Sequence, residues 1–249
     1  MLPGLYGLIG RPLKHSFSKF FFDNLIQHEG LASVCRYELF ELPDASAIAP
    51  FLQTPHLRGF NVTSPYKRDI LPYLSTLCGC ASELGAVNCV CICGEGPVGY
   101  NTDAPAFEED IKSYLTGVRC NRALICGTGG AASAAAYALR KLGFEILFAS
   151  RTAGDSRVSY QSITPQQMKS FAVIVQATPL GMHPRMGECV PLPYDAIEPA
   201  TVCYDMIYNP SETEFLKRCQ RQGAVVSNGY GMLIRQALLS QEIWSGNLL

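Results

Sequence analysis

Residues 123–142 read ALICGTGGAASAAAYALRKL, an apolar stretch followed by a glycine-rich turn and an alanine-rich segment. The pattern predicts a buried strand over 123–126 and a helix over 131–142 that ends at Gly143. Small residues in the turn let a ligand approach the backbone, and the start of the helix offers N–H donors and a positive dipole end. This strand–turn–helix order favours a dinucleotide site over a turn without a ligand. The predicted pyrophosphate-binding residues are Gly127, Thr128, Gly129, Gly130 and Ala131.

The end of the next predicted strand, 144–149, indicates which dinucleotide fits. Ser150, Arg151 and Thr152 follow this strand and are assigned to the cofactor site. An NAD site commonly offers an Asp or Glu here, which accepts hydrogen bonds from the ribose hydroxyls. Arg151 cannot accept such a bond, but its charge and its fork of donors suit a 2′-phosphate. The sequence therefore favours NADP as the cofactor.

Strands and helices alternate along the whole chain. Further strands are predicted over 5–9, 34–40, 60–62, 87–92, 173–176, 202–206 and 224–227. Further helices are predicted over 16–28, 213–222 and 232–243, with a shorter helix from Asp44 to Leu52 and another after Asp103, whose side chain suits a helix N-cap. This alternation predicts an α/β protein whose parallel sheets are covered by helices on both faces.

The composition excludes several classes of protein. The chain has 249 residues, 48% of them hydrophobic and 16% charged, which is enough apolar material for a core and too little charge for a disordered chain. A formal net charge of -1 lacks the basic excess of a nucleic-acid-binding protein. The longest apolar runs are strand-sized, and the first residues lack the pattern of a secretory signal. We therefore expect a soluble cytoplasmic protein that binds neither nucleic acid nor membrane.

The 11 cysteines indicate neither a disulfide framework nor a metal site. The chain is long enough to build a core without disulfides, and an odd number of cysteines without a signal points to reduced thiols. Cys89, Cys91 and Cys93 alternate through a predicted strand, so their thiols share one face and cannot surround a metal tetrahedrally. We expect core or edge cysteines and no metal.

Three segments of the first half carry more polar side chains than a core requires. Ser16 and Ser18 lie at the start of a predicted helix, where they would either cap it or hold an anionic group of a substrate. Lys67 follows a predicted strand in a turn, where it is either a solvated charge or a functional group. Asp103 is either a helix cap or part of a site.

Taken together, motifs along the whole chain resemble those of the shikimate dehydrogenases. They are, in order, residues 12–18 (PLKHSFS), 59–67 (GFNVTSPYK), 85–88 (GAVN), 99–103 (GYNTD), the glycine turn, 177–182 (ATPLGM), 204–208 (YDMIY) and 229–233 (GYGML), followed by Gln236. The number and the order of these motifs exceed what chance similarity explains.

The resemblance implies a two-domain enzyme that reduces 3-dehydroshikimate to shikimate with NADPH, a step of aromatic amino acid (chorismate) biosynthesis. It implies an α/β substrate-binding domain over residues 1–102 and a Rossmann-like NADP-binding domain over 103–230. A C-terminal helix within 231–249 would return to the first domain. The expected partners are small molecules only, and the protein itself is expected to be a monomer or a homodimer.

Carried over motif by motif, the resemblance implies specific roles for polar residues. Lys67 and Asp103 would be the catalytic pair. The remaining implied contacts are Ser16 and Ser18 to the substrate carboxylate, with Tyr208 nearby, Thr63, Asn88, Asp103 and Gln236 to the ring hydroxyls, and Met206 and Gly231, with Arg151, along the cofactor. Hydride arriving at a ketone builds negative charge on oxygen, and a lysine ammonium supplies both a charge and a movable proton, which arginine holds too tightly. A neighbouring carboxylate keeps such a lysine charged and oriented.

The sequence departs from the family pattern mainly after Arg151. Asp155 stands where a second basic residue is common, and the turn-rich segment 152–158 is short for the helix that usually follows. Arg157 could replace the missing base. We expect these changes to affect cofactor affinity more than catalysis.

Two other functions stay open at this point. A relative that acts on quinate or another cyclic hydroxy acid, with NAD, would share most of these motifs. A nucleotide-sensing protein would keep the fold without the chemistry, but the retention of Lys67 and Asp103 beside the hydroxyl-binding positions argues against it.

Overall fold

The structure, a computed structural model, describes residues 1–14 and 16–246, so His15 and the last part of the predicted segment 231–249 lie outside the described residues. The chain divides into two compact units, of which the first comprises Met1–Thr102 with Gln236–Leu249 and the second comprises Asp103–Arg235. The second unit is therefore an insertion between two parts of the first. No helix in the described part of the chain is both long and apolar enough to span a membrane.

The first unit is built on a six-stranded mixed sheet. Its strands, in spatial order, are β2 (Cys35–Glu41), β1 (Gly4–Gly10), β3 (Leu57–Val62), β5 (Cys89–Cys93), β6 (Gly96–Tyr100) and β4 (Thr76–Leu77). β1 runs parallel to β2 and β3, whereas β5 is antiparallel to β3 and β6. The prediction of purely parallel sheets is wrong for this unit, because a two-residue turn at Gly94-Glu95 folds β5 and β6 into a hairpin, whose strands must be antiparallel.

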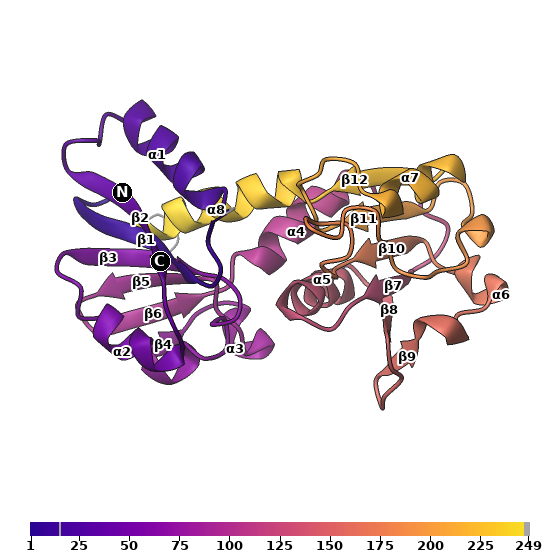
Figure 1. The fold of residues 1–249 in the computed structure, drawn as a ribbon, viewed down its shortest axis with the longest axis horizontal. Helices are drawn as coiled ribbons and strands as arrows, with labels where there is room; N and C mark the ends of the chain where they lie inside the picture. The colour runs from indigo at the N-terminus through magenta and orange to yellow at the C-terminus, as the bar shows by residue number, and fades with distance from the viewer. Residues whose placement is uncertain (15, 247–249) are drawn as a thin grey trace. The chain divides into compact units, whose positions relative to one another are not determined.

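Helices cover both faces of this first sheet (Figure 1). On one face lie α1 (Ser18–His28) and the second half of α8 (Tyr230–Trp244), where the rings of Phe22 and Trp244 are 5.2 Å apart. On the other face, a second apolar cluster joins Phe60 to residues of α2 (Ile48–Phe51) and α3 (Ala81–Leu84), with the 3-10 helices Ala45–Ala47 and Leu71–Tyr73 beside them. Successive strand residues thus alternate between two apolar layers.

The second unit is built on a six-stranded sheet in which every pair of neighbouring strands is parallel. In spatial order its strands are β12 (Val225–Asn228), β11 (Val202–Asp205), β10 (Val173–Gln176), β7 (Arg122–Cys126), β8 (Glu145–Ser150) and β9 (Arg157–Ser159). The chain first continues from β7 to β8 and later returns to β10 on the other side of β7, so the strand order reverses there. Ligands of open parallel sheets bind outside the carboxyl ends of the strands at such a reversal.

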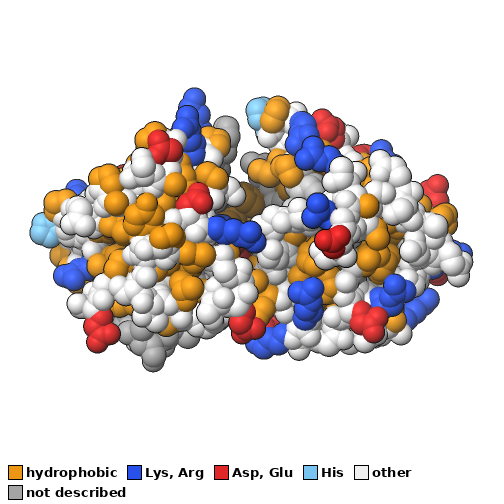
Figure 2. Space-filling model, turned by 90° about the horizontal axis from the view of Figure 1, so that it is seen from below, with side chains coloured by type: hydrophobic (Ala, Val, Ile, Leu, Met, Phe, Trp, Pro, Cys, Tyr) orange, Lys and Arg blue, Asp and Glu red, His pale blue; other side chains and the backbone are white. Residues whose placement is uncertain are grey.

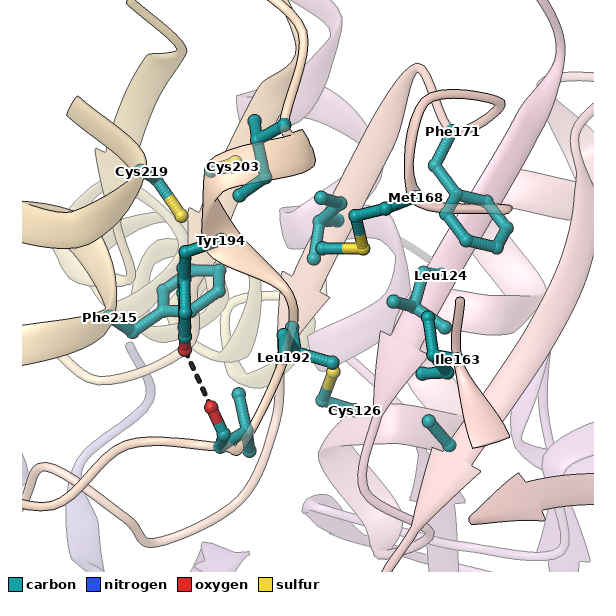
Figure 3. Packing of buried hydrophobic residues seen from close by; sticks show 14 of the residues in the cluster. Leu124, Cys126, Ile163, Met168, Phe171, Leu192, Tyr194, Cys203, Phe215 and Cys219 are labelled. Carbon is teal, nitrogen blue, oxygen red and sulfur yellow. Dashed lines mark hydrogen bonds between the residues drawn. The ribbon is translucent and has the colours of Figure 1, made fainter. Parts of the chain in front are cut away.

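Helices also cover both faces of the second sheet. α4 (Asp103–Lys112) and α5 (Gly130–Lys141) lie on one face, where Phe107 meets Tyr204 edge to face with ring centroids 5.0 Å apart. The other face carries α6 (Pro165–Met168), α7 (Glu214–Arg221) and the 3-10 helices Tyr160–Ser162 and Tyr194–Ala196. Figure 3 shows this second layer, in which the Tyr194 hydroxyl donates to the carbonyl of Val190 over 2.7 Å. This doubly covered parallel sheet has the expected Rossmann-like architecture.

Charged side chains of both signs are scattered over the surface. Figure 2 shows Lys and Arg side chains near Asp and Glu on the face in view, rather than in one continuous basic stripe. All 11 cysteines are free thiols. Among the described residues, no group of three or more His, Cys, Asp or Glu side chains could hold a metal ion.

Candidate functional site

The loops that follow β1 and β3 lie side by side, at the carboxyl ends of these two parallel strands. The backbone N–H of Thr63 donates to the carbonyl of Ile9 over 2.9 Å, and that of Arg11 donates to the carbonyl of Ser64 over 3.0 Å. These two bonds bring the motif at 59–67 beside the motif at 12–18. The carboxyl ends of parallel strands therefore gather the polar residues that the sequence separates.

Lys67 is half-buried in a turn whose backbone is held on both sides. The N–H of Val87 donates to the Lys67 carbonyl over 2.8 Å. The preceding residue, Tyr66, is buried, and its hydroxyl donates to the carbonyl of Leu42 over 2.8 Å. The lysine side chain therefore starts from a fixed backbone position.

The two predicted carboxylate-binding serines have different local contacts. α1 begins at Ser18, two residues later than predicted, because Ser16 lies in the turn that precedes the helix. The Ser16 Oγ accepts a hydrogen bond from the backbone N–H of Ser18 over 3.3 Å, a local contact typical of a serine ahead of a helix. The Ser18 side chain instead interacts with the hydroxyl of Tyr37 on β2, where it opposes the rise in the pKa of that hydroxyl.

These residues adjoin a buried network of hydrogen bonds. The sequence-based assignment does not include this network. The Tyr37 hydroxyl donates to Asn61 Oδ1 over 2.9 Å, and Asn61 Nδ2 donates to Ser240 Oγ over 2.9 Å and to the carbonyl of Asn88 over 3.2 Å. Burial raises the pKa of Tyr37 well above its ordinary value, so its hydroxyl remains a donor. Asn61, between the apolar residues Phe60 and Val62 of β3, is the signal that could have identified the network.

Asn88 holds the segment that leads into α4. Its Oδ1 accepts a hydrogen bond from the backbone N–H of Thr102 over 2.7 Å, and its Nδ2 donates to Thr102 Oγ1 over 2.9 Å. Asp103 follows directly and is the first residue of α4. Of the predicted substrate-binding residues, Asp103 and Tyr208 belong to the second unit, whereas the others belong to the first.

Gln236 lies on α8 within the first unit, one turn before Ser240. The Ser240 Oγ donates to the Gln236 carbonyl over 2.9 Å. Because Ser240 also accepts from Asn61, the helix that carries Gln236 is tied to β3 by the same buried network.

The glycine turn in the second unit has the geometry of an anion site. Gly127 adopts a φ of +116°, and a Cβ there would lie 2.8 Å from the Ala177 carbonyl oxygen, so only glycine fits. Gly129 is the N-cap of α5 and makes no side-chain cap. Thr128, Gly129 and Gly130 are exposed. An exposed helix N-terminus of this kind suits a phosphate group.

The segment after Arg151 contains no helix and closes at once into a tight turn. Ser150 Oγ donates to the carbonyl of Thr152 over 2.6 Å, and Arg157 Nε donates to the same carbonyl over 3.3 Å. The N–H of Gly154 donates to the carbonyl of Arg157 over 2.9 Å, and β9 begins at Arg157. Hydrogen bonds between its own polar groups therefore hold the loop that carries Arg151. The Arg157 side chain takes part in these bonds and lies folded back on the loop.

Met206 and Gly231 lie near the carboxyl ends of strands of the second sheet. The N–H of Met206 donates to the carbonyl of Gln176 over 2.9 Å, which extends the pairing of β10 and β11 by one residue. A Cβ at Gly231 would collide with the carboxylate of Asp110 on α4, which also accepts a hydrogen bond from Tyr204 over 2.5 Å. A side chain at 231 would therefore have to displace the Asp110 carboxylate from its contact with Tyr204.

Asp205, at the end of β11, has no role in the sequence-based assignment, yet its side chain is completely buried. Burial raises the pKa of its carboxyl from 3.8 to about 7, against the opposing effect of hydrogen bonds from Thr213 and from the N–H of Ile207. An acidic residue directly after the apolar strand residues 202–204 is the signal that could have identified it, because carboxylates are rarely buried.

Asp205→Asn is expected to gain stability relative to the wild type as the pH rises. Between pH 3.8 and about 7 the folded protein retains a proton on Asp205 that the unfolded chain has lost, so the unfolding free energy falls with rising pH. Between pH 5 and 8 this loss is about 2–3 kcal/mol, and asparagine removes it. Urea unfolding of both proteins at the two pH values measures the effect. Asp195→Asn, at an exposed position, is the control, and a wild-type-like pH dependence of Asp205→Asn would contradict the raised pKa.

Comparisons with known proteins show which proteins this chain is similar to. Residues 8–90 match the family described as the shikimate dehydrogenase substrate binding domain. The chain is 34% identical to shikimate dehydrogenase (NADP(+)) from Carboxydothermus hydrogenoformans over 258 residues, which cover 97% of this chain and 91% of that protein.

Two solved structures share the fold. Shikimate 5-dehydrogenase from Thermus thermophilus, in complex with NADP(H) and shikimate, has a TM-score of 0.86 and 29% identity, covering 99% of this chain and 94% of that one. Quinate dehydrogenase from Corynebacterium glutamicum, in complex with NAD, has a TM-score of 0.86 and 25% identity, covering 98% of this chain and 94% of that one. The predicted α/β fold class is confirmed.

The similarity to these proteins extends over both units and includes the positions of the quoted motifs. Its extent along the chain, rather than the fold alone, identifies the family, because one fold can host unrelated functions. The resemblance that the motifs carry is thereby confirmed, and the chain belongs to the shikimate dehydrogenase family.

Proposed function

We propose that this chain is an NADP-dependent shikimate dehydrogenase, which reversibly reduces 3-dehydroshikimate to shikimate in aromatic amino acid biosynthesis. The observation that carries the proposal is the similarity over 97% of the chain to an enzyme of that name. The presence of Lys67 and Asp103, at the motif positions of the family's catalytic pair, supports chemistry rather than nucleotide sensing.

Lys67 and Asp103 are the proposed catalytic residues. Bound NADPH supplies the hydride that reaches the carbonyl carbon of the substrate. Lys67 donates a proton to the carbonyl oxygen, and in the reverse direction it removes the proton from the hydroxyl. Asp103 keeps the ammonium charged and oriented. The fixed backbone of Lys67 supports this role, because proton transfer needs a donor in a defined position.

The substrate contacts are proposed from the same motifs. Ser16 and Ser18 bind the carboxylate, with Tyr208 near it, and Thr63, Asn88, Asp103 and Gln236 bind the ring hydroxyls. The network through Tyr37 and Asn61 supports this assignment, since it links the elements that carry Ser18, Asn88 and Gln236. A substrate with several hydroxyls requires such a set of donors and acceptors at fixed positions.

The cofactor contacts are proposed for the second unit. The pyrophosphate lies at the glycine turn, residues 127–131, where the Gly127 conformation and the N-terminus of α5 fit a phosphate. Arg151, with Ser150 and Thr152, binds the 2′-phosphate and adenosine. Met206 and Gly231 line the nicotinamide end of the site. The proposed domains are the substrate-binding segment 1–102, the NADP-binding segment 103–230 and the returning helix within 231–249.

We further propose a cytoplasmic enzyme that is a monomer or a homodimer. The free thiols fit a reducing compartment.

A panel of two substrates against two cofactors tests the proposal. Purified protein is mixed with shikimate or quinate and with NADP+ or NAD+, and the absorbance of the reduced nicotinamide is followed. We expect the highest kcat/KM for shikimate with NADP+. Absence of reduction in all four mixtures would refute the proposed activity.

A second candidate function is the oxidation of quinate with NAD. The likeness to the quinate dehydrogenase from Corynebacterium glutamicum, solved with NAD, favours it, as does the carboxylate of Asp155 in the loop after Arg151. A higher kcat/KM for quinate with NAD+ than for shikimate with NADP+ would select this alternative.

The variant with both Ser16→Ala and Ser18→Ala is expected to raise KM for shikimate about tenfold or more, because two hydrogen bonds to a charged group are lost. Its kcat should change far less, since the carboxylate is bound equally in the ground state and the transition state. Steady-state kinetics measures both constants, with Ser162→Ala, an exposed serine of the second unit, as the control. An unchanged KM would leave the two serines as structural groups of the helix start.

A further inference from the structure

Two completely buried polar side chains lie next to each other at the carboxyl ends of β10 and β11. Gln176 is the last residue of β10 and Asp205 is the last residue of β11, and the two are paired in the strand register. Neither side chain has a part in the proposed reaction. Both strands end at the edge where the strand order reverses, so the loops after them border the proposed cofactor site.

The Asp205 carboxylate fixes both ends of the loop after β11. Its Oδ1 accepts a hydrogen bond from the N–H of Ile207 over 3.0 Å, and its Oδ2 accepts one from Thr213 Oγ1 over 2.5 Å. The same Thr213 Oγ1 accepts from the N–H of Leu216 over 3.3 Å and so caps α7. The carboxylate thus connects residue 207, near the start of the loop, to the first turn of the helix that follows it.

Gln176 fixes the loop after β10 in the same way. Its Oε1 accepts from the N–H of Thr178 over 2.6 Å and from Thr178 Oγ1 over 2.7 Å. Its Nε2 donates to the carbonyls of Thr178 and Leu180 over 3.1 and 3.0 Å, and to Asp205 Oδ1 over 3.4 Å. One amide therefore binds the turn 177–180 and touches the carboxylate that binds the other loop.

We propose that Asp205 is a positioning residue that, through Thr213, Ile207 and Gln176, holds the two loops after β10 and β11 in the shape that receives the nicotinamide end of NADP. The inference rests on the proposed function in taking Met206 as a cofactor contact. The three donors aimed at one carboxylate require an acceptor with two oxygens. An apolar side chain at 205 would leave these buried donors unpaired, at a cost that displaces the loops.

Among the described contacts that shift the pKa of Asp205, none is with a positively charged side chain. The titratable group that interacts with Asp205 is a thiol. Cys126 on β7 is paired with Gln176, on the side of β10 away from Asp205, and its thiol interacts electrostatically with Asp205 and with the thiol of Cys219 on α7. Burial raises the pKa of Cys126, so this thiol stays neutral at physiological pH. Asp205 is therefore held by neutral donors alone, and its charge depends on pH near neutrality, where burial places its pKa.

Substitutions at Thr213 test the proposal without removing the carboxylate. Thr213→Val keeps the shape but loses the hydroxyl, and Thr213→Ser keeps the hydroxyl. We expect Thr213→Val to raise the Kd for NADP+, measured by calorimetry on the full chain, about fivefold or more. Thr213→Ser should restore the Kd to near the wild-type value, and the exposed control Asp195→Asn should not change it. A wild-type Kd for Thr213→Val, or an equal loss in Thr213→Ser, would overturn the proposal.

A purely structural role of Asp205 would not change the pH dependence of NADP+ binding. This pH dependence is therefore a second test of the proposal. The ionised carboxylate accepts from all three donors, whereas its protonated form uses one oxygen as a donor. NADP+ affinity of the wild type should therefore fall between pH 8 and 6 more steeply than that of Asp205→Asn. Titration of the nucleotide's own phosphate is common to both proteins and cancels in the comparison. Parallel curves for the two proteins would overturn the proposal.

Amide hydrogen exchange separates this proposal from the proposed activity. It is measured on wild type and Thr213→Val without nucleotide or substrate. Faster exchange at the Ile207 and Thr178 amides of the variant supports positioning, even if the wild type oxidises neither shikimate nor quinate. Unchanged exchange and unchanged NADP+ binding, in a protein that oxidises shikimate, would overturn positioning and leave the proposed function intact.

Discussion

Lys67→Ala is expected to lower kcat for shikimate oxidation by about 10²–10⁴, the usual contribution of a positioned general acid or base. Binding of shikimate should change far less, because the serines, threonine and amides that hold the substrate remain. The Lys67 backbone is fixed by the N–H of Val87 and by the buried Tyr66, so removal of the side chain should leave the turn in place. Steady-state kinetics together with a shikimate binding titration measures the two effects separately.

Lys67→Arg distinguishes a role of Lys67 in proton transfer from a role of its positive charge alone. Arginine keeps a positive charge but does not release its proton, so this variant should remain nearly as impaired as Lys67→Ala. Lys217→Ala, an exposed lysine on α7, is the control and should retain wild-type turnover. If Lys67→Arg were close to the wild type in kcat, Lys67 would be a binding charge rather than a proton donor.

Arg151→Ala should weaken NADP+ binding by about 2 kcal/mol or more, roughly thirtyfold in Kd, and leave NAD+ binding nearly unchanged. The loss should be selective because only NADP+ carries the 2′-phosphate. The contacts of Ser150 and Arg157 with Thr152 hold the loop independently of the Arg151 side chain. Calorimetric titration of both nucleotides against both proteins measures the selectivity.

Asp155 provides the opposite test in the same loop. Asp155→Arg should strengthen NADP+ binding, and the gain should shrink as salt rises, since exposed charges are screened. We infer that Arg151 and Arg157 together retain a preference for NADP that is weaker than a fully basic loop would give. Equal kcat/KM for NAD+ and NADP+ in the unmodified protein would contradict this inference, and would mean that Asp155 faces the ribose.

The sequence predicts the elements whose patterns are strong and local. The apolar run at 123–126, the glycine turn and the alanine-rich helix all form as predicted, because buried parallel strands and helices have distinct periods. β6 is missed because Gly96, Pro97 and Gly99 hide its strand pattern, and with it the antiparallel hairpin is missed. β9 is missed because a strand of three residues is too short to show a periodic pattern of hydrophobic side chains.

The polar contacts behind the site are harder to predict. The motifs name Asn61 and Asp205, but a motif does not show that Asn61 meets Tyr37 and Ser240, residues 24 and 179 positions away in the sequence. Nor does it show that Asp205 is buried, because burial depends on how α7 packs on the second sheet. Such contacts arise from tertiary packing, which no local period encodes.

The entry of α8 into the first unit has a consequence for how the protein is made. Trp244 packs against Tyr6 and Phe22 and donates to the Val90 carbonyl over 2.9 Å, so one apolar layer of the first unit needs residues that a ribosome adds long after residue 102. The second unit, Asp103–Arg235, contains all of its own strands before those residues emerge. Domains generally fold as units during synthesis. The part of the chain that is made first should therefore be the part that finishes folding last.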